Sequence, residues 1–377
     1  MQKILLVMDS RRWFDREVSR GIFRYARPDR QWTFHRIPLP GKKQREFQLD
    51  WQPDGVIGVW ESEATRSVFE GCPLVEVGSR LASPAEATVS VDQEEVGRRA
   101  ARYFFARGYR HMAFAGNHRF HFSRRRCAGF RAAVESSGRL LHLCDVGEWT
   151  LPLPDHLVEL DRWVSDWLKA LPKPCAILLM NDDYGLWFTQ LALEAGIRVP
   201  GEVAMLGVDN DELGCEAPFP MLSSIAIPAI EIGRAAAEML DRLMRGEKLA
   251  MPHVSLSPGD IVSRRSTDEV GVSHPQVALF MRHVREHPAQ TRDVAHAVEV
   301  LGLQRRSLER AFRKVVGRTP REDLLLARLE YATRRLCTSQ ETLEVIAEES
   351  GFASLSHFCG SFKAYHSMTP TAYRSSH

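Results

Sequence analysis

Apolar and polar positions follow two different rhythms along the chain, and the first rhythm covers residues 1 to about 265. Six short apolar runs occur there: Ile4–Met8, Gly55–Val59, Leu74–Val77, His111–Ala115, Ala176–Met180 and Val203–Val208. Longer amphipathic stretches separate them: Asp15–Ala26, Glu94–Arg107, Arg126–Glu135, Leu157–Ala170, Asp183–Ala195 and Ile230–Met244. Strands that alternate with helices predict parallel sheets with helices on both faces. Because about 265 residues are more than one such sheet needs, we expect two similar α/β lobes.

The remainder of the chain has a helical pattern throughout. Apolar residues recur at helical spacing in Val277–Arg285, Thr291–Val300, Arg305–Val316, Pro320–Leu336, Leu343–Glu349 and Ser354–Tyr365. Residues 266–275 are polar and show no apolar period, so we place an interdomain linker there. The pattern therefore predicts an α/β domain over residues 1–265 and an all-α domain over residues 276–377.

A repeat within the helical part narrows its architecture. Phe312 and Phe362 are 50 positions apart, and the Thr-Pro pairs that end at Pro320 and Pro370 have the same offset. In each copy an apolar helix, a glycine turn and a second helix precede the Thr-Pro pair. This order of elements, present twice, predicts tandem helix-turn-helix units, which read DNA.

The second helix of the first unit has a face suited to DNA. Leu308 and Phe312 should pack inward, whereas Arg306, Arg310 and Arg313 fall on the opposite side. Arginine pairs with guanine through two hydrogen bonds in the major groove. We predict DNA contacts at Arg305, Arg306, Glu309, Arg310 and Arg313, with Arg305, Lys314 and Arg318 as phosphate contacts. The alternative for any single arginine is a solvated surface charge, and the repeat favours DNA binding.

The second unit carries fewer charges on the corresponding helix. Its predicted DNA contacts are Ser354, Ser356, His357, Gly360 and Lys363. A glycine inside a helix costs about 1 kcal/mol relative to alanine, so Gly360 indicates either close approach to a DNA backbone or sequence drift. His357 is either a phosphate donor or a half-exposed neutral histidine.

Charge and cysteine content change this picture little. The net charge is +2, but from Gln276 onward there are 15 Lys and Arg against 11 Asp and Glu, and elsewhere 35 against 37. The basic surplus thus lies with the helix-turn-helix units, as phosphate contact requires.

Seven scattered cysteines without a CxxC pair predict reduced thiols and neither a metal site nor a cofactor. No apolar stretch approaches the roughly 20 residues of a membrane helix, and the N-terminal run is too short for a signal peptide. We expect a cytoplasmic protein without a membrane partner.

Residues 276–375 resemble the AraC family of bacterial transcription regulators. The family's closing signature is present as Ile346-Ala347, Gly351-Phe352, Phe358, Phe362-Lys363, Thr369-Pro370 and Tyr373-Arg374. One position departs from it, because Ser367 stands where the family has a glycine. The resemblance implies two helix-turn-helix units on a connecting helix, each entering a segment of the major groove. We also expect RNA polymerase to be a partner of the bound protein.

The α/β part resembles LacI-type effector domains, which share the periplasmic binding protein fold. Four motifs carry the resemblance: Arg126-Cys127-Ala128-Gly129-Phe130, Asn181-Asp182, Gly207-Val208-Asp209-Asn210 and Arg264-Arg265-Ser266-Thr267. Their polar residues lie at or just after strand ends, where ligands bind in open α/β sheets. We predict a sugar site of Arg126, Asn181, Asp182, Asp209 and Asn210, with Trp13, Phe14 and Trp187 as an aromatic face. The alternatives are helix N-caps for Asp182 and Asp209, and core packing for the aromatic residues.

The order of the two domains, with the sensor first, resembles that of xylose-operon regulators. Phe14–Val18, Asp209–Leu213 and Arg264–Asp268 match their corresponding segments, whereas Asn181-Asp182-Asp183 departs from a Thr-Asp-Ala run. We therefore predict a homodimeric transcription regulator of double-stranded DNA, without enzymatic activity, that a sugar such as xylose controls. Two alternatives stay open. One is an alkyl-transfer enzyme, for which no cysteine has a suitable neighbourhood. The other is an architectural DNA binder without an effector.

Overall fold

The computed structural model describes residues 1–26, 31–37, 51–60, 62–147, 154–272, 274–366 and 368–375. The chain forms two compact units. The first comprises Met1–Ala101, Met112–Leu171 and Ile177–Thr267. The second comprises Arg102–His111, Pro172–Ala176 and Asp268–His377. Ser367, where the chain departs from the AraC-type signature, lies outside the described residues.

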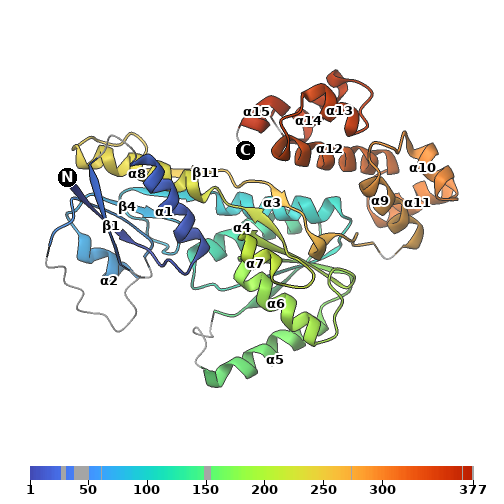
Figure 1. Ribbon diagram of the computed structural model, residues 1–377. Helices are drawn as coiled ribbons and strands as arrows, with labels where there is room; N and C mark the ends of the chain where they lie inside the picture. The colour runs from blue at the N-terminus through green and yellow to red at the C-terminus, as the bar shows by residue number, and fades with distance from the viewer. Residues whose placement is uncertain are drawn as a thin grey trace. The chain divides into compact units, whose positions relative to one another are not determined.

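The described α/β part contains two six-stranded sheets (Figure 1). The first has the order β11 (His253–Leu256), β5 (Thr88–Val91), β4 (Leu74–Val77), β3 (Gly55–Gly58), β1 (Gln2–Val7), β2 (Trp32–Ile37). The second has the order β12 (Ile261–Val262), β10 (Ser223–Ala226), β9 (Val203–Asp209), β8 (Cys175–Leu179), β6 (His111–Gly116), β7 (Leu141–Asp145). All pairings in the first sheet are parallel, and β12 runs antiparallel to β10 in the second. The predicted two-lobed α/β class is confirmed.

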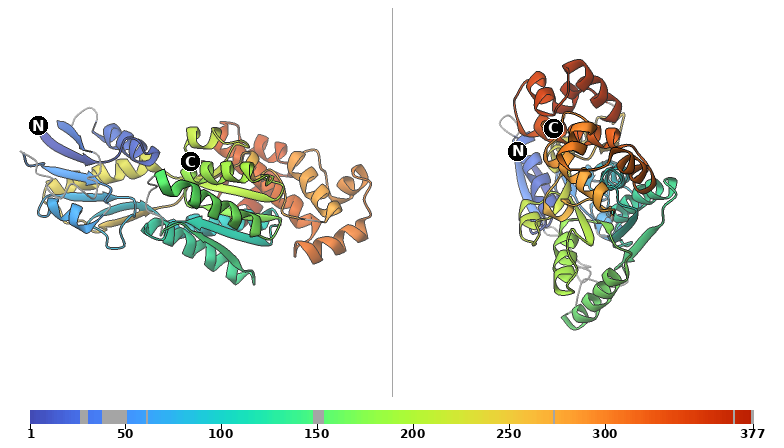
Figure 2. Two further views of the ribbon diagram at one scale, coloured as in Figure 1. Left: turned by 90° about the horizontal axis from the view of Figure 1, so that it is seen from below. Right: turned by 90° about the vertical axis from the view of Figure 1, so that its right-hand side faces the viewer.

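Helices connect these strands and cover the sheets. The longer ones are α1 (Trp13–Tyr25), α3 (Gln93–Ala106), α4 (His121–Ser136), α5 (Pro154–Ala170), α6 (Asp182–Glu194) and α8 (Ala229–Met244). The shorter ones are α2 (Glu63–Arg66), η1 (Ser67–Phe69) and α7 (Glu212–Glu216). α1 and α8 lie side by side (Figure 2). Their backbones touch at Gly21 and Gly233, where a Cβ atom on either residue would collide with a main-chain oxygen of the other helix.

The sequence pattern predicted the buried strands and missed the partly exposed ones. All six apolar runs form strands, because their residues are buried on both sides. β2, β5 and β7 were not among the predicted runs, since exposed or half-buried positions interrupt their buried ones. The short strand β10 is rich in serine and escaped prediction for that reason.

The second unit is helical from α9 onward. Its helices are α9 (Pro275–Glu286), α10 (Val294–Val300), α11 (Arg305–Val315), α12 (Pro320–Thr338), α13 (Leu343–Glu349), α14 (Leu355–His366) and α15 (Pro370–Ser375). Figure 1 shows α9, α10 and α11 at one end of α12, and α13, α14 and α15 at the other. Phe312 and Phe362 are fully buried in two separate cores, one for each end. The predicted tandem helix-turn-helix arrangement on a connecting helix is confirmed.

The junction between the units starts later in the chain than the predicted linker. Ser266 and Thr267 form part of the helical turn η2 (Arg265–Thr267) and are fully buried. The Ser266 hydroxyl donates to the carbonyl oxygen of Met205 at 2.6 Å, and Thr267 shares a hydrogen bond with Ser223 at 2.7 Å. These two residues therefore belong to the first unit, and α9 begins only at Pro275.

Candidate effector and DNA-binding sites

Three neighbouring strands of the second sheet end in polar residues. Gly116 ends β6 and is followed by Asn117, while β8 leads to Asn181 and Asp182, and β9 ends at Asp209. The three strands are consecutive in the sheet order, so these residues gather at one edge. This is the edge at which open α/β sheets bind ligands.

Arg126 is the centre of this group. It projects from α4 and is only 4% exposed. Its Nε donates to Oε1 of Gln93 at 2.7 Å, and its Nη1 donates to the carbonyl oxygen of Met180. Its Nη2 lies 3.8 Å from Oδ1 of Asp209, and its guanidinium lies 5.0 Å from the ring centre of Phe122. Burial lowers the pKa of Arg126, and Asp209 and Asp182 oppose that effect. The protein thus fixes this cation before any ligand binds.

Asp209 is placed by an unusual backbone. Its φ is 120° and that of Asn210 is 58°, conformations that residues other than glycine rarely adopt. The Asp209 carboxylate accepts no hydrogen bond from the described residues, and Arg126 is its ion-pair partner among them. Burial raises the pKa of Asp209 well above its ordinary value, Arg126 opposes this shift, and the nearby Asp182 adds to it. An acceptor of this kind is available to a ligand.

Asp182 is held differently, although it lies close by. It is 2% exposed and accepts hydrogen bonds from the Ser224 hydroxyl at 2.6 Å and the Asp211 amide at 2.8 Å. The Cys215 thiol also donates to it, at 3.4 Å. Burial raises the pKa of Asp182 to about 7. Asp182 therefore joins β10 and α7 to α6, and its oxygens already have protein donors.

The other predicted effector residues have partners or lie elsewhere. Asn181 is the N-cap of α6, since its side chain accepts from the Tyr184 amide at 3.1 Å. Asn210 accepts from Nη2 of Arg264 at 2.9 Å. The helix caps considered for Asp182 and Asp209 are thus supplied by Asn181 in α6 and by Asp211 in α7.

The three aromatic candidates divide between two places. Trp13 and Phe14 begin α1, just beyond the carboxyl end of β1, and both are partly buried. Trp187 lies in α6, where its Nε1 donates to Asp161 of α5 at 2.8 Å and its ring meets Phe188 edge-on. Trp187 therefore packs α5 against α6, as its core-packing alternative predicted.

The sequence pattern did not indicate Gln93, and it indicated only part of the role of the Arg-x-Ser-Thr motif. Gln93 is 8% exposed and is the first residue of α3, two positions after the end of the unpredicted strand β5. A polar residue that follows a strand could have indicated Gln93, but the sequence pattern did not predict strand β5. In the Arg-x-Ser-Thr motif, the Arg264 side chain donates to the carbonyl oxygen of Leu222 at 3.0 Å as well as to Asn210. The motif therefore closes the second lobe and supports Asn210.

The first candidate DNA-reading helix is α11. Leu308 and Phe312 are fully buried, and all five predicted contacts on its other side are exposed. Arg305 forms an ion pair with Glu309 at 2.9 Å. Arg306, Arg310 and Arg313 form no hydrogen bond or ion pair with the described residues. Three guanidinium groups on one helix face are thus available to a polyanion.

The corresponding helix of the second unit, α14, offers fewer charges. Ser354 caps it by accepting from the His357 amide at 3.2 Å, and Ser356, His357 and Lys363 are exposed. A Cβ atom on Gly360 would meet nothing within 4 Å. The fold therefore gives no packing reason for this glycine, which leaves the surface of α14 open at that point.

Arg318, predicted as a phosphate contact, is used inside the second unit. Its guanidinium pairs with Asp323, which is fully buried in α12. Arg285 of α9 pairs with the same carboxylate at 3.1 Å. Arg318 also donates to the carbonyl oxygen of Phe105, at 3.0 Å, in the segment Arg102–His111 of this unit. The partly buried arginines Arg285 and Arg318 and the fully buried Asp323 form a cluster that the charge pattern did not reveal.

Comparison with known proteins follows the same division of the chain. Residues 101–267 match the model of the periplasmic binding protein-like domain, and residues 297–376 match a helix-turn-helix domain. The chain is 26% identical to the xylose operon regulatory protein of Escherichia coli K12, over 99% of this chain and 96% of that protein. It is 23% identical to the protein of the same name from Haemophilus influenzae, over 99% and 98% of the two chains. The solved structure of the xylose-binding transcription activator XylR shares the fold, with a TM-score of 0.63, 24% identity and coverage of 99% and 98%.

The agreement extends through both domains in one order. Over its whole length the chain resembles XylR-like transcription regulators. It joins a periplasmic-binding-protein-like domain to a helix-turn-helix domain in the same order as those regulators. In this chain, no helix of the described part is long and apolar enough to cross a membrane.

Proposed function

We propose that the group around Arg126 and Asp209 binds a sugar, and that binding controls how the helix-turn-helix units engage DNA. The observation that carries this proposal is Asp209. Its carboxylate lies 3.8 Å from Nη2 of Arg126 and accepts no hydrogen bond from the described residues. One sugar hydroxyl can donate to the carboxylate and accept from the guanidinium at the same time. Positive φ at a non-glycine residue is also typical of functional positions.

We propose a pentose such as xylose as the first effector to test. The two bacterial relatives described above are named for the xylose operon. The run Asn181-Asp182-Asp183 departs from the Thr-Asp-Ala expected of xylose-operon regulators, but Asp182 is bound to protein donors. The identity of the sugar therefore depends mainly on Arg126, Asp209 and residues that approach them from the first lobe.

Regulation without catalysis is the proposal for the chain as a whole. Burial raises the pKa of Cys72, Cys127 and Cys215 above the ordinary thiol value. It raises the pKa of Cys144 and Cys175 to about 12. Such thiols stay protonated at neutral pH and are poor nucleophiles, which argues against an alkyl-transfer enzyme.

The proposed assembly is a homodimer in the cytoplasm that works with RNA polymerase at a promoter. The few charges of α14 support the dimer, because a single pair of helix-turn-helix units with one charge-poor helix binds DNA weakly. Linking two copies raises the effective concentration of the second at its half-site. The proposed domain limits are residues 1–265 and 276–377, with Ser266 and Thr267 packed on the first domain.

A calorimetric titration of the full chain tests the sugar proposal. The series contains D-xylose, other pentoses, hexoses and uronates. One sugar should bind the wild type, and Asp209→Asn should weaken it by about 1–3 kcal/mol, because a buried partner loses its hydrogen bond. Glu212→Gln is the matched control, since Glu212 is an exposed acid three positions away. If no sugar binds, or Asp209→Asn binds as the wild type does, the effector proposal is wrong.

A further inference from the structure

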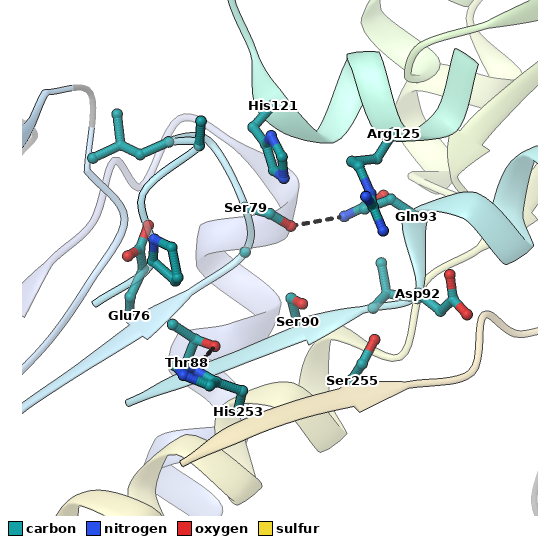
Figure 3. Close-up of a pocket in the computed structure, with 15 residues that line it drawn as sticks. Glu76, Ser79, Thr88, Ser90, Asp92, Gln93, His121, Arg125, His253 and Ser255 are labelled. Atoms are coloured by element: carbon teal, nitrogen blue, oxygen red, sulfur yellow. Dashed lines mark hydrogen bonds between the residues drawn. The ribbon is translucent and has the colours of Figure 1, made fainter. Parts of the chain in front are cut away.

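A second polar pocket lies on the first sheet, and Figure 3 shows it. Its volume is about 360 Å³. Six of its polar lining residues matter here: Thr88, Ser90, His121, Arg125, His253 and Ser255. The strands β5 and β11 form the floor and α4 forms the opposite wall. The pocket is therefore bounded by both lobes of the first unit.

The pocket is separate from the effector group. In β5, Thr88 and Ser90 are partly exposed and line the pocket, whereas Val89 between them is buried and faces the other side of the sheet. Helix α8 contacts β4 and β5, and none of its residues lines the pocket. The described residues that line it include none of the predicted effector residues.

Charge in the pocket is compensated by the protein. Its three ionised side chains each have an opposite charge nearby: Arg125 with Glu94 at 3.1 Å, Asp92 with Arg98 at 3.3 Å and Glu76 with Arg66 at 3.1 Å. Burial lowers the pKa of His121, and Arg124 and Arg125 lower it further, which favours the neutral imidazole. Because the charged side chains of the pocket already have oppositely charged partners, the pocket favours a neutral ligand over an anion.

Several neutral hydrogen-bonding groups are left for such a ligand. The hydroxyls of Ser90 and Ser255 form no hydrogen bond with the described residues. Ser90 is half-buried on the floor, and His121 faces the pocket from the wall. Hydroxyl and imidazole groups both donate and accept, which matches a molecule with several hydroxyls.

Gln93 connects this pocket with the effector group. Its Nε2 donates to the Ser79 hydroxyl at 3.4 Å on the pocket side, as the dashed line in Figure 3 shows. Its Oε1 accepts from Arg126 at 2.7 Å. One side chain therefore touches both places.

We propose that this pocket is a second ligand site, which takes a small neutral molecule with several hydroxyl groups, such as a monosaccharide or polyol. The site goes beyond the proposed effector function and does not depend on it, because the pocket shares Gln93 with the effector group but none of the proposed sugar-binding residues. Its position beside Gln93 places a bound molecule one side chain from Arg126.

The test uses the full chain with Asp209→Asn, so that binding at the effector group is weakened. The probes are D-xylose, D-glucose, myo-inositol and glycerol, with inorganic phosphate as the charged comparison, each followed by calorimetry. At least one neutral probe should bind saturably. Adding Ser90→Leu, which fills the floor, should weaken it by about tenfold or more, equivalent to 1.4 kcal/mol. Ser257→Leu is the matched control, because Ser257 is exposed next to β11 and does not line the pocket.

Each outcome decides the proposal. Saturable binding that Ser90→Leu removes and Ser257→Leu keeps supports it, provided that thermal unfolding shows all variants folded. Absence of binding by every neutral probe overturns it, as does binding that Ser90→Leu leaves unchanged. Tighter binding of phosphate than of any neutral probe also overturns it, since the site would then recognise anions. Failure of the effector proposal would show differently, as equal sugar binding by the wild type and Asp209→Asn.

Discussion

The arginine of the effector group and the arginines of the first DNA-reading helix differ in their burial and in their partners within the protein. Arg126 is 4% exposed and already holds Gln93 and Met180. Arg306 and Arg310 are exposed and have no hydrogen-bond or ion-pair partner among the described residues. A buried charge requires partners inside the protein, whereas an exposed one stays hydrated until a polyanion replaces its counterions. The effector domain therefore orients its cation in advance, and the DNA-binding domain leaves its cations free.

Partly buried arginines in the DNA-binding domain give the largest test of this contrast. Asp323→Ala would remove the fully buried carboxylate that Arg285 and Arg318 share, and Arg285 would keep Glu330 as an ion-pair partner at 3.7 Å. The variant should lose about 3–5 kcal/mol of unfolding free energy, measured by urea denaturation. Glu309→Ala removes the exposed partner of Arg305 and should cost at most about 1 kcal/mol. Similar losses for both variants would show that burial does not distinguish the two kinds of arginine.

The exposed arginines should instead affect DNA binding. Arg306→Ala and Arg310→Ala should each weaken the cognate site by about 1–3 kcal/mol and relax preference at one base position. Arg305→Ala should weaken all sequences alike and lower the salt dependence by about one phosphate contact, because Arg305 is the predicted phosphate contact. Binding to selected and random DNA at several salt concentrations separates these effects. Equal losses on both DNAs for Arg306→Ala and Arg310→Ala would make them phosphate contacts.

The role of Asp182 should be detected in the pH dependence of stability and not in ligand binding. Burial raises its pKa from 3.8 to about 7, so the folded state holds a proton that the unfolded state has released. Stability should therefore fall as pH rises from about 4 to about 7. Asp182→Asn should flatten this part of the profile and cost about 1–3 kcal/mol, since one donor loses its acceptor. Melting temperatures across that pH range give the measurement. An unchanged slope in the variant would assign the pH dependence to another group.

Gly360 gives the smallest effect and compares the two DNA-reading helices directly. Alanine there should stabilise α14 by about 1 kcal/mol, because a Cβ atom would meet nothing in the protein. If α14 lies against a DNA backbone, the same methyl group should weaken DNA binding. Unfolding and DNA titration of one variant measure both effects. A stabilised variant with unchanged affinity would place Gly360 away from DNA.

The sequence predicted these two regions unequally, for physical reasons. Buried strands leave continuous apolar runs, so β6, β8 and β9 were predictable, and with them the meeting of Arg126 and Asp209. In strand β5, buried residues alternate with partly exposed polar ones. The sequence pattern therefore predicted neither this strand nor Gln93. The helix-turn-helix repeat predicted the exposed face of α11, because one helical period fixes which side is buried. It could not predict that Arg318 turns inward, since its partner Asp323 is positioned by the next helix.

Ligand control requires that the effector group and the DNA-reading helices are thermodynamically coupled. Coupling is reciprocal, so operator DNA must change sugar affinity by the same factor by which sugar changes operator affinity. The measurement is a titration of the full chain with D-xylose, or with the sugar found to bind, in the absence and presence of saturating selected operator at fixed salt. Ligand control predicts equal factors, of about fivefold or more, in the two directions. Sugar affinity that is unchanged on saturating operator would contradict ligand control of DNA binding.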